Sequence, residues 1–185
     1  MKEKIKYSVY FVVLLTMYSC GIYKLNTGNV GDAKTIQVDF FPNQAALIEP
    51  TLSQRFTQDM QDLFLRQTNL DLVNNNGDLR FEGEITQYRV NPMAATAQQT
   101  AAQNRLTITV NVRFYNRLKE EDDFEKQFSF YSDFDANAQL TGGVLDAALE
   151  EILERIIQDI FKEDLNKSSI KATVSEVMKE RKNQI

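Results

Sequence analysis

The 185-residue chain has no histidine and no tryptophan, and it contains a single cysteine, Cys20. Without histidine there is no imidazole to serve as the base of a serine or cysteine triad, and the commonest zinc ligand is missing. One thiol excludes an intramolecular disulfide, a CxxC redox motif and an iron–sulfur cluster held by this chain alone. We therefore expect no metal and no cofactor.

The cysteine follows a segment typical of an export signal. MKEKIK supplies three lysines and one glutamate, and an uncharged, mostly apolar run then extends from Tyr7 to Tyr18. A membrane-spanning helix needs about 20 apolar residues, whereas the core of a secretory signal needs only about 7 to 15. The pattern predicts that residues 1–19 are a signal peptide and that the protein is exported.

The residues around Cys20 resemble the lipobox of bacterial lipoproteins. Small residues, Ser19 and Gly21, flank the cysteine, although Met17 stands where leucine is usual. In that family the signal is cut before the cysteine, whose sulfur carries a diacylglyceryl group and whose new amino group is usually acylated. Two or three acyl chains anchor a protein stably. The alternative is a signal anchor with an incidental cysteine.

Charge and composition divide the rest of the chain. The whole chain has a net charge of −5 and residues 1–19 carry +2, so the mature chain would carry −7 and would be a poor partner for nucleic acid. Residues 20–33 hold three of the seven glycines and are interpreted as a lipidated tether. Residues 34–165 form the expected domain. Residues 166–185, with five basic and two acidic residues, predict either an amphipathic helix or a disordered tail.

Hydrophobic periodicity predicts the fold of residues 34–165. Apolar residues recur every three or four positions from Ile48 to Phe64, in a helix expected to begin at Asn43 or Pro50, and again from Leu145 to Ile160. Alternating apolar and polar residues predict strands in 34–41, 78–85, 105–116 and 123–134, with a short strand before a turn at 76–77. We therefore expect an α+β two-layer sandwich, with two helices packed on one face of a roughly four-stranded, mainly antiparallel sheet.

Carboxylate pairs are the remaining catalytic candidates. Glu82 with Glu84, and Glu150 with Glu151, lie in polar runs. A glycosidase needs two carboxylates from different segments facing one cleft, with the pKa of one raised by burial. Ordinary surface charge is the favoured interpretation, so we do not expect an enzyme, and a hydrolase ranks last.

A basic segment is the most informative feature for binding. From residue 85 to residue 119 there is no acidic residue. The alternation of the strand places three of its cations on the polar face of the sheet, where they suit phosphate or carboxylate groups. A face balanced by neighbouring acidic strands is the alternative. The uncharged stretch 91–104 is either a long hairpin tip or a segment that becomes ordered inside a partner. The candidate ligand-binding residues are Arg89, Arg105, Arg113, Arg117 and Lys119.

The order of these features resembles the LPS-assembly lipoprotein family LptE over roughly residues 20–162. The segments that carry the resemblance are the lipobox cysteine, TIQVDFFPNQA, PTLSQRFTQDMQDLFLRQTNLDLV, DLRFEGEITQYRVNP, NRLTITVNVRFYN and the final amphipathic helix. The residues after Phe161 match no part of the family pattern that we can place.

The resemblance implies a lipoprotein on the periplasmic face of the outer membrane, without a catalytic motif. Such a protein sits as a plug within the β-barrel LptD, assists the folding of that barrel and binds lipopolysaccharide (LPS) on its way to the cell surface. The five cations are assigned from charge and not from the family. A stand-alone periplasmic carrier or binding module for a lipid or an anionic ligand is the alternative function.

Overall fold

In the computed structural model, residues 30–93 and 102–182 are described, with side chains as far as Asp164. The signal peptide, Cys20, most of the tether and the stretch 94–101 lie outside the described residues, so the structure does not bear on lipidation or on the hairpin tip. Among the residues described, no helix is both long and apolar enough to cross a membrane.

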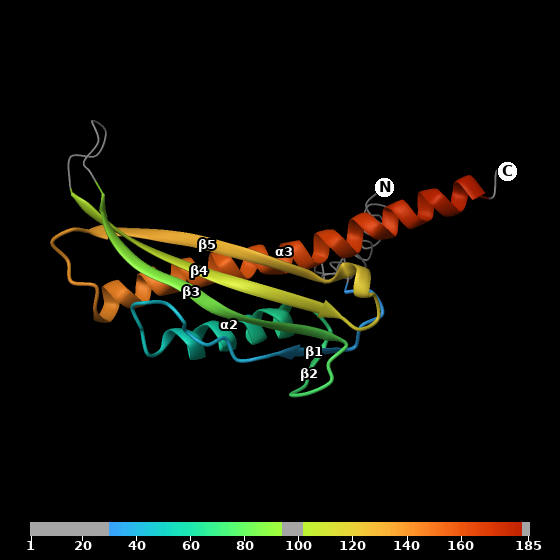
Figure 1. Ribbon diagram of the computed structural model, residues 1–185, viewed down its shortest axis with the longest axis horizontal. Coiled ribbons are helices and arrows are strands. Elements are labelled where there is room, and N and C mark those ends of the chain that lie inside the picture. The colour runs from blue at the N-terminus through green and yellow to red at the C-terminus, as the bar shows by residue number, and fades with distance from the viewer. Residues whose placement is uncertain (1–29, 94–101, 183–185) are drawn as a thin grey trace, which may run out of the picture.

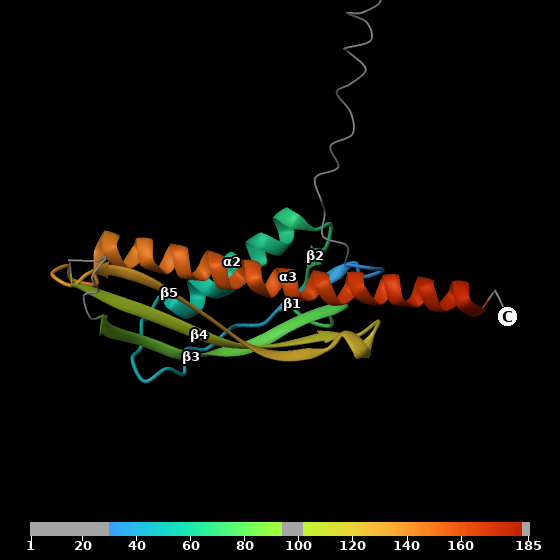
Figure 2. The ribbon, with the colours of Figure 1, turned by 90° about the horizontal axis from the view of Figure 1, so that it is seen from above.

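Five strands form one sheet in the order β2-β1-β3-β4-β5, and two helices lie on one face of it (Figures 1 and 2). Each of β3, β4 and β5 is long, so the molecule is elongated along the strand direction. The strands are β1 (Thr35–Val38), β2 (Asp71–Leu72), β3 (Leu79–Met93), β4 (Gln103–Asn116) and β5 (Phe124–Asp135), and the helices are α2 (Leu52–Gln67), the 3₁₀ turn η1 (Glu120–Asp122) and α3 (Gly142–Lys182).

The α+β two-layer arrangement predicted from the sequence is confirmed. The three long strands pair in antiparallel fashion, as expected. The sheet differs from the prediction at its other edge, where β1 pairs in parallel with both β2 and β3. The reason is that α2 connects β1 to the strands that follow, and a crossover through a helix returns the chain in the same direction.

The core lies between the sheet and the helices. Ile108, Val110 and Val112 of β4 are fully buried, as the alternation predicts. Two aromatic contacts centred on Phe64 of α2 join the layers, because its ring lies 4.9 Å from that of Phe81 in β3 and 5.2 Å from that of Phe161 in α3. Burial of such side chains contributes about 1.5 to 3 kcal/mol each, so the packing of the helices stabilises the sheet.

The start of the first helix differs from the prediction. The helix begins at Leu52, and Ile48, expected in its apolar stripe, is 69% exposed in the preceding connection. A helix cannot begin at Asn43, because the chain there is extended against β3. The Ile85 N–H donates to the carbonyl of Pro42, and the Gln44 N–H donates to the carbonyl of Ile85, both at 2.9 Å.

A bulge at Thr86 divides β3. The register with β4 shifts between Ile85 and Gln87, so odd-numbered residues face the helices before the bulge and Tyr88 faces them after it. The shift also moves Arg89 to the polar face, opposite Thr107. The three-residue spacing from Ile85 to Tyr88 is the signal in the sequence that could have revealed it.

Helix α3 extends well beyond the end of the sheet (Figures 1 and 2). It comprises 41 residues, which corresponds to a length of about 60 Å. Its backbone is helical through Lys182, so residues 166–182 continue the helix that packs on β5 instead of forming a separate coil.

Candidate functional site

The five predicted cations are spread along the polar face of the sheet. Arg89 lies opposite Thr107, whereas Arg117 follows the last residue of β4, ten positions further along that strand. At about 3.3 Å per residue the two arginines are roughly 33 Å apart. The prediction of one localised basic surface is therefore wrong, because the length of β4 separates Arg89 and Arg105 at one end of the sheet from Arg117 and Lys119 at the other.

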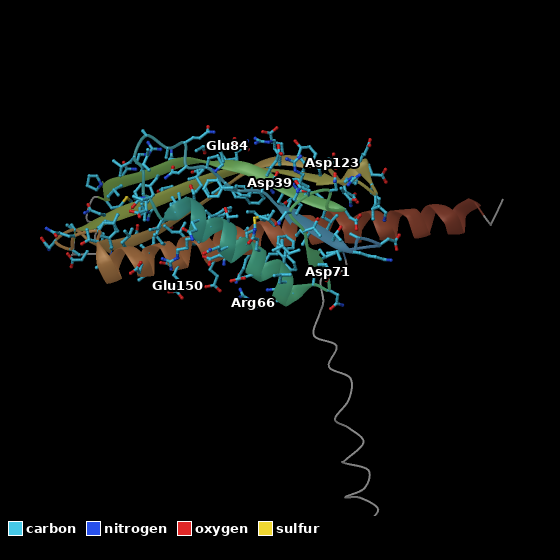
Figure 3. The ribbon with its side chains drawn as sticks, turned by 90° about the horizontal axis from the view of Figure 1, so that it is seen from below. Asp39, Arg66, Asp71, Glu84, Asp123 and Glu150 are labelled. Atoms are coloured by element: carbon cyan, nitrogen blue, oxygen red, sulfur yellow. The ribbon has the colours of Figure 1, made fainter. Side chains whose placement is uncertain are left out.

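Arg113 is held by carboxylates of the neighbouring strand. Its Nε donates to Glu82 at 3.0 Å, and its Nη2 donates to Glu84 at 2.9 Å. Hydrogen bonds from Arg113, followed by one from Asn111, hold the pKa of Glu84 below its usual range. Glu84 lies on the side of the sheet away from the helices (Figure 3). A general acid needs a raised pKa, whereas the pKa of Glu84 is lowered, so Glu84 is not suited to that role.

A second arginine extends the same network toward β1. Arg80 donates through Nε and Nη2 to Asp39, at 2.8 and 2.6 Å, and its Nη2 also lies 2.7 Å from Glu82. Cations and carboxylates thus alternate from Asp39, directly after β1, across β3 and β4. Arg80 was not among the predicted cations, although its alternation with Glu82 and Glu84 places all three on the polar face.

Arg105 is paired at the other end of β4. Its Nε and Nη2 donate to the two carboxylate oxygens of Asp133 at 2.7 and 2.8 Å, and its guanidinium lies 3.5 Å from the ring centre of Tyr131. The hydrogen bonds from Arg105 lower the pKa of Asp133. For Arg105 and Arg113 the structure therefore matches the alternative interpretation, a face balanced by acidic neighbours.

The three remaining cations are exposed. Arg89, Arg117 and Lys119 form no ion pair with a carboxylate in the described part of the chain. Arg117 donates instead to the backbone carbonyl of Asn76 at 3.0 Å. Exposed arginines without a carboxylate partner are the cations best placed to bind an anionic ligand.

An amphiphilic groove surrounds Arg89. It has a volume of about 510 Å³ and is formed by the exposed connection before α2 together with β3 beyond its bulge. Leu47 is 58% exposed and Val90 is 37% exposed, so exposed apolar side chains line the groove together with Arg89. The groove, with Leu47, Arg89 and Val90, combines an anion-binding group with apolar surface, as a phosphorylated lipid requires.

These features define an α+β domain whose polar face is built from ion pairs, and no group of three or more metal-ligating side chains occurs within the residues described. The chain belongs to the LptE lipopolysaccharide-assembly family, whose pattern matches residues 33–163. The family resemblance inferred from the sequence is therefore confirmed. No match was found among curated protein sequences.

Several solved structures resemble the chain at low identity. A protein from Xanthomonas campestris is 11% identical with a TM-score of 0.49, covering 76% of this chain and 88% of that one. A hypothetical protein from Chlamydia trachomatis is 9% identical with a TM-score of 0.48, covering 72% and 97%. The rare lipoprotein B from Shewanella oneidensis is 14% identical with a TM-score of 0.34, covering 78% and 98%. Likenesses this distant carry no argument about function.

Proposed function

We propose that this protein is an outer-membrane lipoprotein that binds and plugs a β-barrel LPS translocon of the LptD type, assisting assembly of the barrel and delivery of LPS to the cell surface. The observation that carries the proposal is the LptE family match over residues 33–163. Acyl chains on Cys20 would hold the domain at the periplasmic face of the outer membrane, and this part of the proposal rests on the lipobox alone.

The shape of the domain supports a plug. The 15 residues of β3 correspond to about 50 Å of strand, and only two layers of secondary structure lie across the short dimension (Figure 2). The long strands are braced by the core and by the ion pairs of Arg105 and Arg113. A slender, rigid body of this kind suits insertion along the axis of a barrel.

The groove at Arg89 supports contact with LPS. LPS carries phosphate groups next to acyl chains, and the groove is lined by Arg89 together with exposed Leu47 and Val90. Of the five candidate cations we assign the main contact to Arg89. Arg105 and Arg113 would first have to release carboxylates that lie within 3 Å, which costs binding free energy.

Co-purification tests the partnership. The tagged, lipidated chain is isolated from outer membranes solubilised in mild detergent, with an unrelated tagged lipoprotein as control. We expect a large β-barrel protein to accompany this chain and not the control. A chain that purifies alone would overturn the plug and would favour the stand-alone carrier.

Charge reversal tests the groove. Arg89→Glu should weaken binding of purified LPS roughly tenfold or more, because it removes a charged hydrogen-bond donor and adds a repulsive charge. Lys119→Glu makes the same change of charge at the opposite end of the sheet and is the matched control. Equal losses in the two variants would indicate nonspecific attraction, and unchanged binding in Arg89→Glu would remove the groove from the proposal.

A further inference from the structure

A polar hollow lies at the end of the sheet opposite Arg89, where the β2–β3 connection meets the end of β4. It has a volume of about 770 Å³. Arg80 of β3 and Arg117 after β4 both line it, together with the phenol of Tyr115 and the amides of Gln37 and Asn76. Cationic, amide and aromatic groups from three separate segments thus meet in one place.

The β2–β3 turn is fixed against β1, so the hollow is formed before any ligand arrives. The Asp78 carboxylate accepts hydrogen bonds from the N–H groups of Lys34 and Thr35 at 2.9 and 3.1 Å, which lower its pKa. Asn76 has a φ of 57°, and a Cβ on Gly77 would lie 2.7 Å from the backbone nitrogen of Gln37. A preorganised turn reduces the entropy lost on binding.

Both arginines keep donors that the fold does not use. Arg117 is oriented by its own backbone, whose N–H donates to the carbonyl of Asp78, and by Nη1, which donates to the carbonyl of Asn76. Its Nε and Nη2 have no hydrogen-bond acceptor within the residues described. Nε and Nη2 of Arg80 donate to carboxylates, and its Nη1 has no hydrogen-bond acceptor within the residues described.

The remaining lining groups suit hydroxyl groups on a ring. The side-chain amide of Asn76 offers donors and an acceptor, which match a sugar hydroxyl that does both, whereas the amide of Gln37 is already hydrogen-bonded to Asp39 and Gly77. Tyr115 is 36% exposed, and burial and the nearby Glu82 raise the pKa of its hydroxyl, which stays protonated. An aromatic ring with a polar tip can cover the apolar face of a sugar. A net charge of −5 disfavours nucleic acid as the occupant.

We infer that this hollow binds an anionic saccharide, with Arg117 on the phosphate or carboxylate, Nη1 of Arg80 as a further donor, and Tyr115 and the amide of Asn76 on the ring. The site is separate from the groove at Arg89 and does not depend on it. The same chemistry occurs on a free sugar phosphate and on the phosphorylated saccharide of a glycolipid.

Calorimetric titration of the full-length chain in detergent tests the inference with four probes. These are glucose 6-phosphate, a fully deacylated phosphorylated oligosaccharide prepared from LPS, glucose and inorganic phosphate. We expect at least one of the first two to bind more tightly than either glucose or phosphate, because only they offer the ring and the anion together. Whether the free sugar or the oligosaccharide binds better identifies the source. If neither exceeds inorganic phosphate, the inference is overturned.

Variants locate the site. Arg117→Gln should weaken binding of the favoured probe roughly 10- to 100-fold, the range for loss of charged hydrogen bonds. Lys119→Gln removes an exposed cation two residues away that does not line the hollow, and it should leave binding within about twofold. Equal losses in both would overturn the site. Arg89→Gln should also leave this binding unchanged, which separates a failure here from a failure of the LPS proposal.

Discussion

Substitution of Gly83 by alanine tests how the sheet is built. Gly83 lies in β3 between Glu82 and Glu84, the carboxylates that hold Arg113. A Cβ at this position would lie 2.0 Å from the carbonyl oxygen of Asn111 in β4 and 2.7 Å from the ring of Phe41. Because carbon and oxygen normally approach no closer than about 3.3 Å, β3 and β4 would have to separate by more than 1 Å.

The expected cost follows from two contributions. Overpacking of a close-fitting core costs about 1 to 3 kcal/mol, and a stretched or broken hydrogen bond between the strands adds about 1 kcal/mol. We expect Gly83→Ala to lower the free energy of unfolding by about 3 kcal/mol. With a urea m-value of about 2 kcal/mol/M, the midpoint should fall by about 1.5 M.

Urea unfolding followed by circular dichroism measures the effect, and Gly143→Ala is the matched control. No atom lies within 4 Å of a Cβ at Gly143, near the start of α3, so alanine there should be neutral or stabilising by up to about 1 kcal/mol. A loss of less than about 1 kcal/mol in Gly83→Ala, or equal midpoints for the two variants, would refute the reasoning.

Three further predictions concern charge, pH and anchoring. Arg105→Glu places a second carboxylate beside Asp133 and should lower the melting temperature more than Arg105→Gln does; equal temperatures would mean that repulsion at this pair is negligible. Burial, followed by the charge of Asp122, raises the pKa of Asp164 to about 7, above its ordinary value near 3.9. The stability that this carboxyl contributes when neutral is present below pH ~4 and is lost as the pH rises through ~7, so Asp164→Asn should gain stability over the parent at pH 8 but not at pH 4; a pH-independent difference in urea midpoints would contradict this. Cys20→Ala should abolish acyl labelling and release a folded protein from membrane fractions, and labelling that persists would rule out Cys20 as the acceptor.

The structure also changes which charge variants are informative. The sequence suggests a double reversal, Arg105→Glu with Arg113→Glu, as a test of LPS binding that leaves the fold intact, since both sites were expected to be solvated. Both side chains are only 28% exposed and both are paired. Reversal would place like charges against Asp133 and Glu82, so it would disturb the sheet as well as the ligand. Arg89 and Arg117 allow a cleaner test.

Local patterns predicted most of the architecture. The apolar residues of β4 and of both helices face the core as their periodicities predict. The free energy gained by burying a residue depends mainly on its own side chain. One local prediction was wrong for a nonlocal reason: Ile48 is exposed because the chain before α2 is bound to β3. The bulge at Thr86, which places Arg89 on the polar face, was not predicted.

The charged residues show more clearly what the sequence alone does not predict. The sequence places Arg113 and Glu82 on one face of the sheet, but it does not say that they meet. Their contact depends on the register between two strands whose pairing joins positions 31 residues apart. Register is a property of the whole sheet, fixed by the turns, the bulge and the packing of the helices. All the ion pairs between strands therefore depend on the same register.

The sequence by itself determined the class of the protein: an acidic α+β domain without histidine chemistry, preceded by a pattern typical of an exported lipoprotein. Composition and periodicity are enough for this, since both depend only on the identity and the order of the residues. Only the tertiary structure decided which cations remain available to a ligand. Antiparallel pairing neutralised Arg105 and Arg113 and carried Arg89 and Arg117 to opposite ends of the sheet, because strand register, and not sequence order, determines which charges become neighbours.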